Sequence, residues 1–180
     1  SNIFFLKLKE DYSNNSKLYG EMKFILKLVQ NIDNLISYFF SNNANERKYL
    51  IEKFKERKII CFDIGANLGG YINFISNNLN IKELHVFEPS KKCVSFLKSK
   101  YNKLNYLIIN KAVSNVNKTS YFYENEILSA SSLHKNKNKN KFTKNYNYNK
   151  KYKINCISLD NYCKNFSKKF KIDILKIHAE

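Results

Sequence analysis

Two acids and a glycine-bearing turn are the residues of this 180-residue chain that could do chemistry. Asp63 closes a short apolar run, and Gly65, Asn67 and Gly69 follow it at two-residue intervals. Glu88 closes the next apolar run, 23 residues after Gly65. In nucleoside-binding folds, an acid about 20 residues after such glycines accepts hydrogen bonds from a ribose diol. The spacing therefore predicts a nucleoside ligand between the turn and Glu88.

The elements that must position these residues read as strand, turn, helix and strand. Residues 59–62 and 84–87 are apolar runs of strand length, and 71–79 carries apolar residues at helical spacing. Buried parallel strands end at a common sheet edge, and glycine lets a turn bring its backbone close to a ligand. The pattern predicts an α/β fold with a Rossmann-like, doubly wound and mostly parallel sheet.

The turn also bears on which nucleoside binds. The dinucleotide fingerprint is G-x-G-x-x-G, and Asn67 stands where its second glycine would be. An acid at Asp63 suits a cationic sulfonium ligand with an amino group better than a pyrophosphate. These residues favour S-adenosyl-L-methionine and leave an NAD-linked oxidoreductase of the same fold as an alternative.

Six sequence blocks together resemble the FkbM-type methyltransferases, which are class I S-adenosylmethionine-dependent enzymes. The blocks are FDIGAN from Phe62, FEP from Phe87, AVS from Ala112, SSL from Ser131, ISLDNY from Ile157 and IDILKI from Ile172. They occur in the family's order and span roughly residues 58–180. The resemblance implies a methyltransferase acting on a small hydroxyl acceptor, often a sugar.

The resemblance also implies roles for the turn and the acids. Glu88 would bind the ribose hydroxyls of the cofactor, and Asp63 and Gly65 would serve its methionine end. Asn67 would shape the turn or contact the ligand, and Gly69 would complete the cofactor-binding turn.

Three further polar residues are candidates for the same site. Asn110 follows the expected third strand, so it either lies near the adenine or is a turn asparagine. His178 replaces an aspartate of the family pattern. It is either a general base, since an unperturbed histidine titrates near pH ~6.5, or a neutral substitution at a position where the family's acid was dispensable. Glu180, the last residue, could bind the acceptor or a cation, but the spacing predicts no metal site.

We expect two regions in the chain, a helical leader over residues 1–57 and the N-terminal part of a methyltransferase domain over 58–180. Apolar residues recur at helical spacing from Met22 to Phe39, and Asn45 could cap a second helix that ends at Phe54. The leader would pack on the domain or, alternatively, cover the cofactor or bind a partner helix.

The methyltransferase part has a predicted order of elements after Glu88. A helix opens at Ser90, a third strand spans 106–109, and 119–123 pairs with 152–158 in an antiparallel excursion. A short helix begins at Asp160, and 172–177 is the fourth central strand. The resemblance implies further strands, so we expect a sheet truncated after this fourth strand, with a bare edge.

The formal charge of +17 is unevenly spread. Residues 134–153 hold eight lysines and no acid, interleaved with asparagine and tyrosine. Such a tract is typical of a low-complexity, solvated insertion. The alternative is a surface for nucleic acid or another polyanion on a catalytically degenerate fold.

The cysteines and the hydropathy pattern indicate the compartment. None of the four cysteines forms a C-x-x-C pair, so they read as reduced core residues, not as metal ligands or disulfides. No apolar stretch reaches the ~20 residues of a membrane span, and no secretory signal opens the chain. We expect a cytoplasmic protein whose oligomeric state the sequence does not determine.

Overall fold

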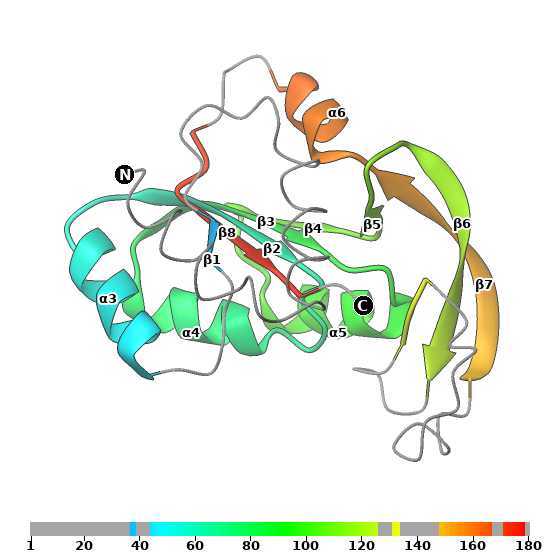
Figure 1. The fold of residues 1–180 in the computed structure, drawn as a ribbon. Coiled ribbons are helices and arrows are strands. Elements are labelled where there is room, and N and C mark those ends of the chain that lie inside the picture. The colour runs from blue at the N-terminus through cyan, green and yellow to red at the C-terminus, as the bar shows by residue number, and fades with distance from the viewer. Residues whose placement is uncertain (1–36, 39–43, 126–130, 134–147, 167–170, 179–180) are drawn as a thin grey trace, which may run out of the picture.

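The computed structural model describes residues 37–38, 44–125, 131–133, 148–166 and 171–178. The helices in these ranges are α3 (Ala44–Phe54), α4 (Gly70–Asn78), α5 (Lys91–Lys100) and α6 (Leu159–Lys164). The strands are β1 (Ser37–Tyr38), β2 (Ile59–Ile64), β3 (Ile81–Phe87), β4 (Tyr106–Ile109), β5 (Ala112–Val113), β6 (Lys118–Asn125), β7 (Tyr148–Ile157) and β8 (Ile174–Ile177). They form one five-stranded and one three-stranded sheet (Figure 1).

The five-stranded sheet, sheet A, has the order β1-β8-β2-β3-β4, and all its pairs are parallel. Helices α3, α4 and α5 lie on one face and α6 lies on the other (Figure 1). This confirms the predicted Rossmann-like α/β fold with a mostly parallel sheet. Because parallel strands end at one edge, the residues after β2, β3 and β8 meet there.

Strands β2 and β8 and the carboxyl half of β3 are buried between the two faces of sheet A, which is why these stretches are mostly apolar. On the α4 side, Leu84 and Val86 pack with Ile72 and Ile75 in one core cluster. On the α6 side, a second cluster is built on Phe62, Phe87, Leu159 and Leu175. The two clusters fix β2 and β3 from both faces and so fix the positions of their carboxyl ends.

The helix starts follow from local capping. Ser90 precedes α5, and its hydroxyl accepts a hydrogen bond from the Cys93 amide at 3.3 Å. Ser158 caps α6 in the same way by accepting from the Asn161 amide at 3.2 Å. The α5 start is as predicted, and α6 begins one residue earlier than predicted because Ser158 is its cap.

The three-stranded sheet, sheet B, has the order β5-β7-β6. β6 and β7 pair antiparallel from Lys118 opposite Cys156 to Asn125 opposite Tyr148, which confirms the predicted excursion. Sheet B lies beyond the carboxyl ends of the sheet A strands (Figure 1). It therefore faces the edge at which the candidate residues converge.

Three expectations about the leader and the sheet edge are wrong. Residues 37–38, placed in a helical stripe, form strand β1, and β1 pairs with the edge of β8 that was expected to be bare. The physical reason is that an open strand edge offers unpaired peptide groups to any extended segment nearby. Asn45 lies inside α3, which begins at Ala44, so it is not the helix cap.

Much of the leader and of the lysine–asparagine tract cannot be compared with its prediction. Residues 1–36 and 39–43 lie outside the described ranges, as do 134–147. The last six residues of the tract, 148–153, belong to β7 and are therefore a strand, not a loop.

The four cysteines are free thiols; Cys61, Cys93 and Cys156 are buried as core residues, whereas Cys163 is half-buried. In the part of the chain that the structure describes, no helix has both the length and the apolar character needed to cross a membrane.

We expect Gly69→Ala to lower the free energy of unfolding by about 1–3 kcal/mol. Gly69 has a φ of 78°, and an added Cβ would lie 2.7 Å from Tyr101 and 2.8 Å from Leu97. Gly70→Ala is the matched control, because its Cβ would meet nothing within 4 Å. Urea unfolding of both variants measures the difference, and equal midpoints would contradict the strain at Gly69.

Candidate functional site

The turn after β2 is built from residues with left-handed backbone. Gly65, Asn67 and Gly69 have φ values of 71°, 51° and 78°. Glycine takes this conformation at no steric cost, and asparagine tolerates it better than most residues. The Gly65 amide donates to the Phe87 carbonyl at 2.9 Å, which holds the turn against the end of β3. The alternation of these residue types in the sequence thus encodes a tight, strand-anchored turn.

Glu88, directly after β3, faces this turn. Its Oε2 accepts from the Asn67 amide at 2.7 Å, and its Oε1 accepts from the Ser90 amide at 2.8 Å. Each carboxylate oxygen can accept more than one hydrogen bond, so both oxygens keep capacity for a ligand. The side chain is therefore fixed in place while still able to bind hydroxyl groups.

The electrostatics of Glu88 follow from its position. Only 5% of the residue is exposed, and burial raises the pKa of its carboxyl above the ordinary value. The two backbone hydrogen bonds oppose that rise in pKa because they stabilise the ionised form. A buried acid held by amides in this way is an acceptor for a diol and a poor partner for a phosphate.

A second carboxylate fastens sheet B to the same corner. Glu124, which is 4% exposed, accepts from the Ser90 hydroxyl at 2.7 Å and from the Tyr152 hydroxyl at 3.1 Å. Ser90 thus donates its amide to Glu88 and its hydroxyl to Glu124. The network ties β6 and β7 to the residue that orients Glu88.

Asp63 lies behind the turn, at the end of β2. It is 0% exposed, and its Oδ1 lies 2.8 Å from the Lys176 ammonium on neighbouring β8. Lys176 also donates to the Gly65 carbonyl at 2.9 Å. Burial raises the pKa of Asp63, and the positive charge of Lys176 opposes that rise. Beyond this ion pair, no donor among the described residues reaches either carboxylate oxygen.

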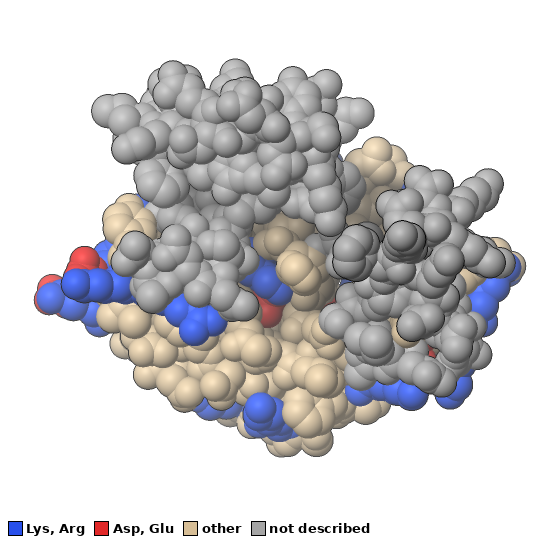
Figure 2. Space-filling view, turned by 60° about the horizontal axis from the view of Figure 1, so that its bottom comes forward, with Lys and Arg blue, Asp and Glu red and all other residues tan. Residues whose placement is uncertain are grey.

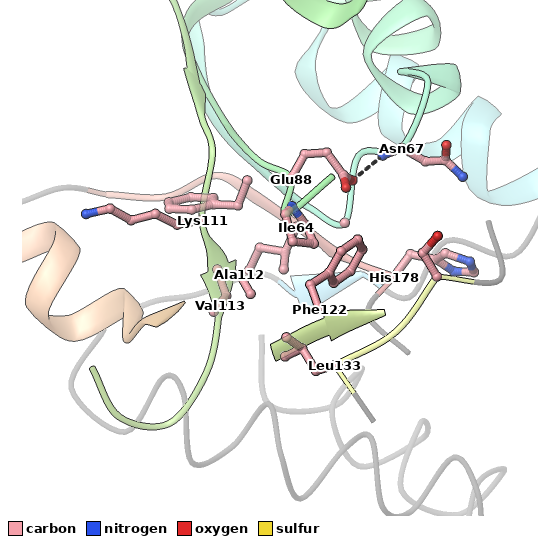
Figure 3. A pocket seen from close by; sticks show the side chains of 13 residues that line it. Ile64, Asn67, Glu88, Lys111, Ala112, Val113, Phe122, Leu133 and His178 are labelled. Carbon is pink, nitrogen blue, oxygen red and sulfur yellow. Dashed lines mark hydrogen bonds between the residues drawn. The ribbon is translucent and has the colours of Figure 1, made fainter. Parts of the chain in front are cut away.

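A pocket opens between the turn and sheet B (Figure 3). Gly65, Asn67 and Glu88 form its polar side, and these residues come from the ends of β2 and β3. The other side is largely apolar, with Ala112, Val113, Phe122 and Leu133. A space-filling view shows basic side chains around the periphery of the described surface, with a small group of basic and acidic atoms near the centre of the view (Figure 2). The pocket joins one polar wall to one apolar wall, as a nucleoside requires.

Two other candidates, His178 and Asn110, lie at or beside this pocket, which Lys111 also lines. His178 lines it, is exposed, and is held by its amide, which donates to the Ile64 carbonyl at 2.9 Å. Lys111 lines the opposite side, and its long side chain extends away from the other labelled residues (Figure 3). Asn110 is exposed, and its amide nitrogen donates to the carbonyls of Glu88 and Pro89 at 3.0 and 2.9 Å. It braces the backbone at the pocket's rim.

The remaining sequence candidates are not pocket-lining residues of the described structure. Gly69 precedes α4 and accepts a hydrogen bond from the Tyr101 hydroxyl at 3.0 Å, so it shapes the turn. Asp63 is shielded by the turn, and its direct contact with a cofactor stays a prediction. Glu180 lies outside the described residues. Among the residues that are described, no group of three histidine, cysteine or acidic side chains could hold a metal ion.

Sequence reasoning missed three contributors to the site. Lys176 lies in the block IDILKI, and a lysine within the apolar run ILKI is a signal of a buried partner. Phe122 and Glu124 come from the excursion, where alternation indicated a strand but not which face meets the pocket. Only the packing of sheet B against the sheet A edge places them.

Comparison with known proteins supplies the family. Residues 63–180 match the methyltransferase FkbM domain, which is more than half of the chain and begins at Asp63. Neither the curated proteins nor the solved structures contain a match. The family match decides against the NAD-linked oxidoreductase and implies a methyl donor and a small-molecule acceptor. The chain belongs to the FkbM family of methyltransferases.

Proposed function

We propose that this methyltransferase uses S-adenosyl-L-methionine and methylates a hydroxyl group of a sugar or of another small acceptor. The observation that carries the proposal is the Glu88 carboxylate, fixed at the pocket by the Asn67 and Ser90 amides. A ribose diol needs two aligned acceptors, and a carboxylate held in this way supplies them without further ordering.

The polar and apolar groups of the pocket match the ribose, the methionine end and the adenine of this cofactor. Glu88 would accept from the ribose hydroxyls, and the Gly65–Asn67 turn would pass close to the methionine end. Phe122, Leu133 and Ala112 give an apolar wall against which the adenine would pack. Because the Asn110 amide nitrogen is already committed to backbone carbonyls, only its oxygen would meet the adenine amino group.

The chemistry asked of the protein is positioning and proton removal. When bound, S-adenosylmethionine supplies a methyl group on a sulfonium, which is transferred by in-line displacement. The turn and Glu88 would hold the donor so that an acceptor oxygen lies in line with that methyl group. His178 would accept the proton of the acceptor hydroxyl through a neutral ring nitrogen, since it is exposed at the pocket. We place the reaction in the cytoplasm.

We expect wild-type protein to bind S-adenosylhomocysteine, and Glu88→Ala to weaken that binding by about 100-fold or more. The variant removes the two hydrogen bonds that the ribose hydroxyls would donate to the buried, charged carboxylate. Calorimetric titration measures the dissociation constants, with NAD as a ligand control. Glu52→Ala, an exposed glutamate on α3, is the matched variant control and should bind as the wild type does. Absence of binding by folded wild-type protein would refute the proposed cofactor.

We expect the affinity for S-adenosylhomocysteine to fall as the pH is lowered from 8 towards the raised pKa of Glu88. Burial raises the pKa of Glu88, so its carboxylate takes up a proton at a higher pH than the ordinary 4.5 and then loses acceptor capacity. Calorimetric titration at several pH values measures whether the affinity falls as the pH is lowered. Glu88→Gln should bind weakly with little dependence on pH. A wild-type affinity with the same pH dependence as Glu88→Gln would contradict the role of Glu88.

We expect His178→Ala to lower the rate of methyl transfer by about 10²–10⁴ while leaving the affinity for S-adenosylhomocysteine nearly unchanged. The reason is that a base acts on the acceptor and not on the cofactor. Transfer of labelled methyl groups to a panel of sugars and other small hydroxyl compounds measures the rate. If the variant keeps the wild-type rate on every acceptor that is methylated, His178 is not the base.

A further inference from the structure

Lys176 is a charged residue in the middle of the buried sheet. It belongs to β8, whose other residues are isoleucine and leucine, and only 8% of it is exposed. Its backbone lies level with Asp63 in the parallel register of β8 and β2. A lysine so placed needs a counter-ion and full use of its donors, because burying an ammonium group is otherwise very costly.

The ammonium group lies over the Tyr71 ring, and its two polar contacts together span the site. It lies 2.8 Å from Asp63 Oδ1, and it donates to the Gly65 carbonyl at 2.9 Å. Gly65 is the first left-handed residue of the turn and lines the pocket. One side chain therefore joins β8, the end of β2 and the backbone that would touch the cofactor.

Stability alone does not account for this arrangement. A buried ion pair can often be exchanged for apolar residues of similar size without loss of stability. An apolar pair, however, could not donate a hydrogen bond to the Gly65 carbonyl. The feature that requires lysine here is the anchored turn, and the feature that requires Asp63 is the buried charge of that lysine.

We propose that Lys176 is a positioning residue for the cofactor, with Asp63 as its counter-ion. Its hydrogen bond to Gly65 holds the turn in the conformation that aims the Asn67 amide at Glu88. Asp63 then acts on the cofactor indirectly, through the ammonium group of Lys176 and the turn. This inference rests on the proposed binding of S-adenosylmethionine at that turn.

The test separates the effect of the hydrogen bond from Lys176 to Gly65 from the effect of the buried ion pair on stability. In Asp63→Leu/Lys176→Met both charges are removed together, so the protein should unfold near the wild-type urea midpoint. Its dissociation constant for S-adenosylhomocysteine should nevertheless rise about tenfold or more, the effect of losing one hydrogen bond to a charged group. Hydrogen exchange at the Asn67 amide should also be faster in the unliganded double variant than in the wild type.

A second ion pair joins the same part of the sheet at its other end and provides the matched control. Arg57 lies 2.8 Å from Asp173, which precedes β8 and accepts a hydrogen bond from the Ile60 amide at 2.9 Å. Arg57→Met breaks this pair far from the turn. It should lower the urea midpoint but leave the affinity for S-adenosylhomocysteine unchanged.

The outcomes are distinct. Wild-type affinity and wild-type exchange at Asn67 in the double variant would overturn the positioning role and leave the cofactor assignment intact. Failure of the wild type itself to bind S-adenosylhomocysteine would refute the cofactor assignment and the inference with it. Should Asp63→Leu/Lys176→Met not fold, Asp63→Asn/Lys176→Gln carries the test, because the shorter, neutral glutamine also withdraws the ammonium from Gly65.

Discussion

The hydrogen bond from the Asn67 amide to the Glu88 carboxylate joins the turn after β2 to the end of β3, across 21 residues of sequence. It can form only if β2 and β3 lie side by side in parallel register and the turn after β2 folds back sharply. The parallel register comes from apolar strands buried on both faces, and the turn comes from three residues with left-handed backbone. The pocket depends on this contact because it sets the distance between the turn and the acid.

Polar contacts around that bond come from parts of the chain that are distant in sequence. From one side, Lys176 of β8 holds the Gly65 carbonyl. From the other side, Glu124 of β6 holds the Ser90 hydroxyl, while the Ser90 amide holds Glu88. The fourth central strand and the excursion are thus fastened to one corner. Buried polar networks of this kind are stable only when their members are paired, which favours a single arrangement of the site.

Sheet B gives the pocket its apolar wall. Phe122 of β6, with Leu133 packed beside it, faces a polar wall made from strand ends of sheet A. In an open α/β fold the ligand crevice lies outside the carboxyl ends of the strands, where loops normally close it. Here a three-stranded sheet takes that place. A wall built on strands is more rigid than one built on loops, which suits the recognition of a flat, apolar ring.

The sequence by itself determined the parallel α/β unit, the turn and the acid after β3, because each depends on local residue types. Apolar runs specify buried strands, Gly65, Asn67 and Gly69 permit the left-handed turn, and Ser90 caps the next helix. These local rules, with the order of six motifs, were sufficient to identify the family.

The tertiary structure alone decided the partners of Asp63 and Glu124. Lys176 lies 113 residues after Asp63 in the chain, and only the parallel pairing of β8 with β2 brings their side chains together. The pairing of β1 with the outer edge of β8 could not be predicted from the sequence pattern either, because edge pairing depends on which extended segment lies nearest.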